Sequence, residues 1–227
     1  TTLGQSTGET LTTTSNTVLI GYHAGYAINS TDADGTVVIG YESGKAITSG
    51  QYNTAIGYQA LYTEDDGDGN TAVGYKALKA QTGTSGTVGN TAVGLQAGTA
   101  VTTGTRTTLM GYQAGISLTT PYACVAIGYQ AMSEGTNASH IVAIGQTAFN
   151  KIATDGNASR NVAIGSAAGE LMTNGQRATF LGYAAGAKYD SDNAFVNQTF
   201  VGAEAGYNHT SGVSNTLVGT NALYGTS

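Results

Sequence analysis

One short pattern of apolar and small residues around a glycine recurs along the whole chain. It reads NTAIGYQAL at residues 53–61 and returns as NTAVGYKAL from residue 70 and NVAIGSAAG from residue 161. The central glycine occurs thirteen times, at spacings of 17, 19 or 20 residues. A period near twenty residues is typical of a solenoid, in which each turn packs its apolar face on the next. After Gly4 in the first copy, the anchor glycines are Gly21, Gly40, Gly57, Gly74, Gly94, Gly111, Gly128, Gly145, Gly165, Gly182, Gly202 and Gly219.

The residues just before each glycine predict a short strand. After the first copy, the third position before the glycine is always Val or Thr, and the position directly before it is Ile, Val, Leu or Met. Such β-branched and aliphatic residues favour strand over helix. These two positions point the same way in a strand, and we predict that they form the inner face of each coil.

The residue between them is then expected to point outward, yet from Gly21 onward it is apolar in every copy. A soluble chain rarely leaves so long an apolar stripe uncovered, so another copy of the chain is the simplest cover. We therefore predict a homotrimer whose shared axis is lined by these larger residues: Leu19, Val38, Leu109, Phe180, Phe200 and Leu217.

The turn after each glycine shows a compensation in size. Four residues after the anchor stands either glycine or a large apolar residue, such as Leu61, Leu78 or Met132. Where it is glycine, the residue three further on is usually apolar, as at Ile28, Ile47 and Leu118. We predict that these two positions fill the same layer of the core at constant density. The anchor glycine itself fits either a corner with φ > 0 or a contact too close for a Cβ atom.

Tyrosine follows the anchor in seven copies, four of them consecutive: Tyr22, Tyr41, Tyr58 and Tyr75. Residues at one position of successive turns lie about 4.8 Å apart, so these rings are expected to stack as a ladder. The ladder has two interpretations, a structural stack with exposed hydroxyls or an aromatic platform for sugars.

Composition narrows the function classes. The chain has 227 residues with 34 Gly, one Pro and only 10% charged side chains. A net charge of −6 argues against a nucleic-acid partner, and no apolar run is long enough for membrane insertion. We expect residues 1–227 to form a single repeat domain, and because the first residues are already within a repeat, an excerpt of a longer fibre.

Few residues carry candidate chemistry. An acidic turn supplies weak candidates for bound Ca²⁺ in Asp66, Asp68 and Asn70, with a solvated turn as the alternative. Asp32 and Asp192 belong to similar turns. The remaining carboxylates are scattered and do not form the converging pair that glycoside hydrolysis needs. We therefore expect no enzyme activity and no cofactor, and we interpret the single Cys124 as an inert buried thiol.

The motifs NTAIG, NTAVG and NVAIG, each with a small residue three positions on, resemble the repeats of YadA-like heads of trimeric autotransporter adhesins. They are also similar to the Ala-Ile-Gly-Tyr repeats of bacteriophage tail-fibre proteins, especially marine ones. This resemblance covers essentially the whole chain. It implies an all-β, left-handed parallel β-roll, three chains side by side, and attachment to a host-surface glycan or protein from a virion or a cell surface.

These observations support two hypotheses. The first is a non-enzymatic attachment fibre, in which the segment either binds a receptor or acts as a spacer. The alternative is an ice-binding β-solenoid, because such proteins also use short repeats rich in Gly, Thr and Tyr. Ice binding needs a flat exposed file of Thr, whereas the regular Thr file here alternates with Val at a position expected to face inward.

Overall fold

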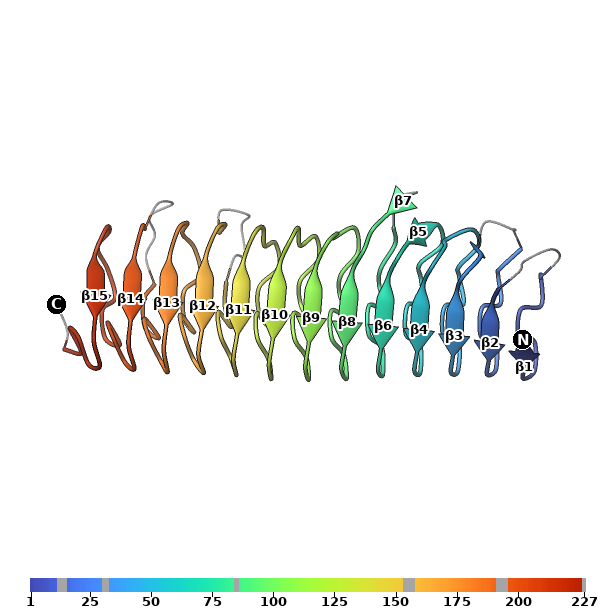
Figure 1. Cartoon of the computed structure of the whole chain (residues 1–227), viewed down its shortest axis with the longest axis horizontal. Coiled ribbons are helices and arrows are strands. Elements are labelled where there is room, and N and C mark those ends of the chain that lie inside the picture. Colours follow the sequence, from blue (N-terminus) through green and yellow to red (C-terminus); the bar gives the residue numbers. More distant parts are fainter. Residues whose placement is uncertain (12–15, 30–32, 84–85, 153–157, 191–195, 226–227) are drawn as a thin grey trace. The chain divides into compact units, whose positions relative to one another are not determined.

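A computed structural model describes residues 1–11, 16–29, 33–83, 86–152, 158–190 and 196–225. The chain divides into two compact units, Thr1–Met110 and Gly111–Ser227, and both are built from the same repeat. Within the described ranges the regular structure consists of short strands without an α-helix (Figure 1). Asp32 and Asp192 lie outside these ranges.

In the first unit, each copy of the repeat contributes one strand to a parallel sheet. The strands follow one another in the order β1 (Thr2–Leu3), β2 (Val18–Ile20), β3 (Val37–Ile39), β4 (Thr54–Ile56), β6 (Thr71–Val73), β8 (Thr91–Val93) and β9 (Thr108–Met110). The register aligns equivalent positions, such as Thr54 with Thr71 and Ala55 with Ala72. A second parallel pair joins β5 (Gly67–Asp68) to β7 (Gly86–Thr87) in the turns.

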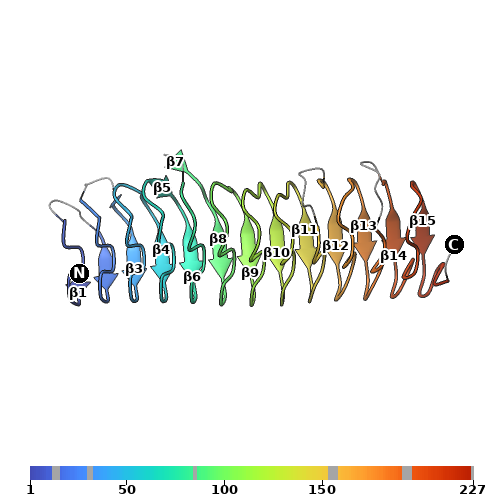
Figure 2. The same cartoon turned by 180° about the vertical axis from the view of Figure 1, so that it is seen from behind.

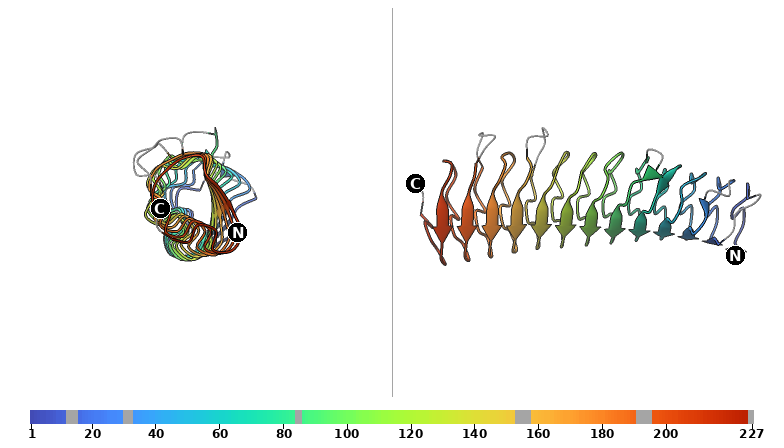
Figure 3. Two further views of the ribbon diagram at one scale, coloured as in Figure 1. Left: turned by 90° about the vertical axis from the view of Figure 1, so that its left-hand side faces the viewer. Right: turned by 45° about the horizontal axis from the view of Figure 1, so that its top comes forward.

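The second unit repeats this arrangement. Its strands are β10 (Val125–Ile127), β11 (Val142–Ile144), β12 (Val162–Ile164), β13 (Thr179–Leu181), β14 (Thr199–Val201) and β15 (Thr216–Val218), paired in parallel in that order. Figure 2 shows from behind that the strands of each unit point the same way. In Figure 3, each turn closes around an interior.

The predicted parallel β-solenoid is confirmed. The main strands described here number seven in the first unit and six in the second, which equals the thirteen copies of the repeat. Each of these strands ends directly before an anchor glycine. The left-handed sense of the coil and a single domain spanning residues 1–227 stay predictions.

The predicted faces of the strand are wrong. In the three-residue strands from β2 to β14 the middle residue is buried inside its own coil, and the residues on either side of it are at least partly exposed. Leu19, Val38, Leu109, Phe180 and Phe200 are fully or almost fully buried, and Leu217 is partly buried in the last turn. The physical reason is volume, because the interior of the coil buries a large apolar side chain on all sides and one face of a sheet does not.

The two predicted sources of core packing are confirmed. Leu61, Leu78 and Met132 are fully buried, and so are Ile28, Ile47 and Leu118. In a turn with glycine four residues after the anchor, the side chain three residues further on fills the space that a large residue occupies in other turns. A Cβ atom added at Gly44 would lie 2.8 Å from Cδ1 of Ile47.

The anchor glycines satisfy both interpretations of their role. Their φ angles lie between 122° and 140°, where residues with a Cβ atom are strained. Most of them also lie against the next turn: a Cβ atom at Gly182 would be 2.5 Å from the carbonyl oxygen of Gly202. At these positions glycine is therefore required both by backbone conformation and by the close approach of successive turns.

Candidate functional site

The strand residues that flank the buried middle position form a continuous surface in each unit, which we call the outer sheet face. Parallel register lines up equivalent side chains of neighbouring strands on this face. In the first unit it consists of Val18, Ile20, Val37, Ile39, Thr54, Ile56, Thr71, Val73, Thr91, Val93, Thr108 and Met110. In the second unit it consists of Val125, Ile127, Val142, Ile144, Val162, Ile164, Thr179, Leu181, Thr199, Val201, Thr216 and Val218.

The chemistry of the outer sheet face is uniform. All its residues are aliphatic or threonine, and none carries a charge. Most are partly exposed, and Met110 and Ile164 are each 42% exposed. An uncharged and largely apolar face of this kind is typical of a protein contact. Thr54, Thr71, Thr91 and Thr108 form a file of consecutive threonines on it.

The predicted tyrosine ladder is present. The rings of Tyr22, Tyr41, Tyr58 and Tyr75 stack with centroid separations of 5.1–5.3 Å and interplanar angles of at most 18°. At one end Tyr22 stacks on the ring of His23, and at the other the Nζ atom of Lys76 lies 4.8 Å from the Tyr75 centroid.

The stacking favours one of the two interpretations of the ladder. Sugars bind aromatic residues through the open face of a ring. Each inner ring is covered on both faces by its neighbours, and the end rings are covered by His23 and Lys76. The geometry therefore favours a structural stack that presents ring edges and hydroxyl groups.

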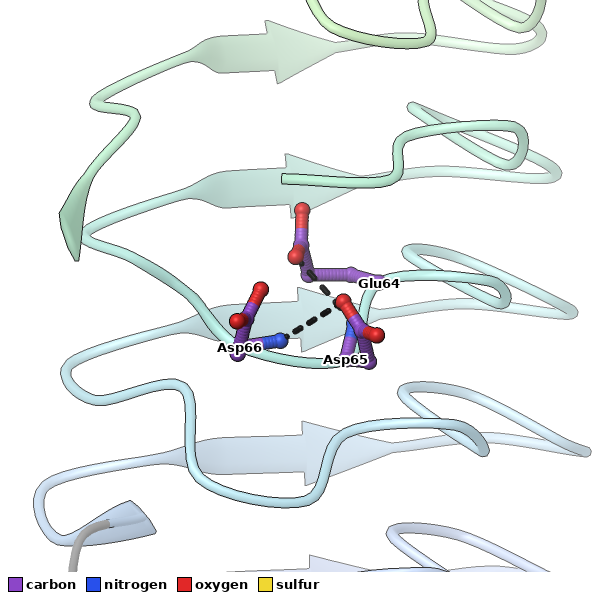
Figure 4. A group of neighbouring side chains, drawn as sticks. All are labelled: Glu64, Asp65 and Asp66. Atoms are coloured by element: carbon purple, nitrogen blue, oxygen red, sulfur yellow. Dashed lines mark hydrogen bonds between the residues drawn. The ribbon is translucent and has the colours of Figure 1, made fainter. Parts of the chain in front are cut away.

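The predicted ligands Asp66, Asp68 and Asn70 do not form one acidic group. Asp68 accepts a hydrogen bond of 2.8 Å from the Gln51 amide, and Asn70 is buried, where its side-chain oxygen accepts from the amide of Asn90. The carboxylates that lie together are Glu64, Asp65 and Asp66, with one oxygen of each within 4.8 Å of the others (Figure 4).

Within this acidic turn, the Glu64 carboxylate has a structural role. Glu64 is fully buried and accepts hydrogen bonds from the amides of Gly67 at 2.8 Å and Gly83 at 2.9 Å. It therefore joins its own turn to the next one. The Asp65 amide also donates to Glu64, and the Asp66 amide donates to the Asp65 carboxylate (Figure 4). These bonds hold the carboxylates of Glu64 and Asp65 in place.

Burial raises the pKa of the Glu64 carboxyl, against the opposing effect of its amide donors. In the folded protein Glu64 therefore holds its proton to a higher pH than in the unfolded chain, so its contribution to stability is fully present below the unfolded pKa and falls as pH rises through the folded one. Denaturant unfolding should show the wild type gaining stability relative to Glu64→Gln as pH falls from about 7 to about 4.

A second variant separates titration from hydrogen bonding. Glu64→Leu leaves the amides of Gly67 and Gly83 without an acceptor, which should cost about 1–3 kcal/mol for each amide at every pH. A wild type that loses stability relative to Glu64→Gln on acidification would contradict the raised pKa.

The asparagine that opens the clearest repeats forms a buried ladder that was not predicted from the sequence. The side-chain oxygen of Asn53 accepts from the amide of Asn70 at 2.8 Å, and that of Asn90 accepts from the amide of Thr107 at 2.9 Å. The Asn53 amide group also donates to the carbonyl of Gly67. The recurrence of Asn directly before the strand was the available signal. Its role is to pair backbone groups inside the coil.

Other candidates are structural or scattered. Cys124 is buried, and burial raises the pKa of its thiol, as fits an unreactive side chain. His209 is also buried, stacked on Tyr189 at 5.7 Å, and burial lowers the pKa of its imidazole. The described residues enclose no pocket.

Comparisons with protein-family models, curated proteins and solved structures found no match to this chain. A search of the described residues found no helix with the length and hydropathy of a membrane span.

Proposed function

We propose that this chain is a non-enzymatic segment of a fibrous attachment protein, a virion tail fibre or a cell-surface adhesin, and that it self-associates into a homotrimer through the outer sheet face. The observation that carries the proposal is the absence of charge on a partly exposed face made of Ile, Val, Thr, Leu and Met. Because Phe180 and Phe200 lie inside the coil, the proposed interface is formed by the flanking strand residues and not by these two. The flanking residues form a largely apolar face that still needs to be covered.

Two further copies of the same chain suit this face best. Its ridges repeat once per turn, because equivalent residues pair in register from strand to strand. A second copy has the same period, so its ridges match over the whole length of a unit, whereas a partner with another period would lose register after a few turns. The number three comes from the resemblance to trimeric adhesin heads and tail fibres.

A charge placed on the outer sheet face should break the assembly. Val93→Asp would bury a carboxylate in an apolar interface three times in each trimer, and we expect at least about tenfold weaker association. Thr103→Asp is the matched control, because Thr103 is an exposed turn residue that follows the same strand. Sedimentation velocity of both variants is the measurement. Unchanged association of Val93→Asp would exclude this face as the interface.

One observation favours the second candidate, an ice-binding solenoid. The file of Thr54, Thr71, Thr91 and Thr108 belongs to the outer sheet face, which removes the objection that these residues point inward. In the second unit the file is interrupted by Val125, Val142 and Val162. A thermal hysteresis assay separates the candidates, since thermal hysteresis by a monomeric chain would support ice binding and oppose the fibre.

A further inference from the structure

One edge of the second unit carries a file of basic side chains. The position five residues before the anchor glycine is His140, Arg160 and Arg177 in three consecutive turns, and all three are exposed. Each adopts a left-handed backbone, with φ of 55°, 59° and 63°. The same local conformation in successive turns gives the three side chains equivalent starting directions.

Backbone pairing sets the spacing of this file. Ser139, Ser159 and Gln176, the residues directly before the three basic ones, form consecutive parallel bridges. The amide of Arg160 donates to the carbonyl of Ser139, and that of Arg177 to the carbonyl of Ser159, both at 3.3 Å. Arg160 and Arg177 therefore lie one turn apart, about 4.8 Å along the stack.

The described residues that adjoin the file include polar side chains. Ser139 contacts His140, with Oγ 2.8 Å from Nδ1, and the ring of Tyr122 packs edge-on against that imidazole at 5.2 Å. None of the residues in the bridges or directly after them is acidic. The Arg160 side chain forms no ion pair with any described residue. This concentration of positive charge stands out in a chain with 8 Lys and Arg and a net charge of −6.

We propose that Arg160 and Arg177, with His140 beside them, bind the sulfate or carboxylate groups of a linear acidic polysaccharide. The inference rests on the proposed attachment function and names its ligand class. Guanidinium groups pair with planar or tetrahedral anions through two parallel hydrogen bonds. An open edge without a pocket suits a polymer that lies along the stack better than a small ligand. The net charge of −6 disfavours double-stranded nucleic acid, which carries one negative charge per about 1.7 Å of its axis.

Calorimetric titration of the whole chain tests the proposal. The probes are dextran sulfate for sulfate groups, polygalacturonate for carboxylates and unmodified dextran as the neutral control. We expect one or both acidic polymers to bind and dextran not to bind. Arg160→Gln/Arg177→Gln should weaken binding by at least about tenfold, since each arginine contributes a charge-assisted contact.

Arg106→Gln is the matched control. Arg106 occupies the same repeat position in the first unit. The equivalent residue of the preceding turn is Gly89, which has no basic side chain. The Arg106→Gln substitution should leave affinity nearly unchanged. Wild-type protein that binds neither acidic polymer, equal affinity of the double variant, or tighter binding of single-stranded DNA through the same arginines would each overturn the site. If the wild-type protein is a trimer but binds neither acidic polymer, only this site is overturned. If the protein is a monomer, the proposed fibre is overturned.

Discussion

Phe200→Asp is expected to unfold the turns around β14 and not to release intact subunits. Phe200 is fully buried, with ring centroids of Phe180 at 5.2 Å, His209 at 5.6 Å and Tyr189 at 6.0 Å. Truncating a buried Phe costs about 3–5 kcal/mol, and a buried unpaired carboxylate adds several more. Because each turn supports its neighbours, the loss should spread through adjacent turns of the second unit.

Amide hydrogen exchange measures this effect turn by turn. In Phe200→Asp, protection should fall in β13, β14 and β15 and persist in the first unit. Phe200→Leu is the control, because it keeps an apolar side chain and removes only part of the ring packing. A Phe200→Asp protein with wild-type protection in β14 would show that the aromatic side chain is not part of the core.

Gly182→Ala should be the second most damaging substitution. The new methyl group would lie 2.5 Å from the carbonyl oxygen of Gly202, and φ of 137° adds backbone strain of about 1–3 kcal/mol. Neither turn can retreat easily, because the amides of Gly182 and Gly202 are bonded to preceding strands at 2.8 Å. We expect a clear fall in the midpoint of thermal unfolding of the second unit.

Gly219 provides the comparison that separates strain from steric overlap. It has a similar φ of 122°, yet a Cβ atom there would meet nothing within 4 Å. Gly219→Ala should therefore cost the backbone strain alone. Equal destabilisation by the two substitutions would show that close stacking of turns contributes nothing to the need for glycine.

The period of the repeat predicted the strands and the turns, and it predicted the burial of both Leu61 and Ile47. It did not predict the direction of the strand faces, because a three-residue strand offers two assignments of alternating side chains with the same spacing. The deciding signal was size. The middle position varies from Ala55 to Phe180, as a core position balanced by other side chains does, while the flanking positions stay β-branched or aliphatic.

The backbone of the turns was also open to prediction. Glycine alternates with Leu, Met and Phe four residues after the anchor, and the structure holds all of these residues at positive φ, as at Leu61 with 52° and Leu78 with 47°. The recurrence of glycine at this position was the sequence signal for a positive φ. The role of Glu64 could not be predicted, because its partner amide at Gly83 comes from the next turn and depends on the exact closure of the coil.

The mass of the assembly in solution tests the central claim most directly, that copies of this chain cover one another's outer sheet faces. One chain weighs 22.8 kDa, so three weigh 3 × 22.8, or about 68 kDa. Sedimentation equilibrium of the whole chain should return the mass of three copies, and Val93→Asp should lower it. A wild-type protein that sediments as a single chain at every concentration tested would contradict the account.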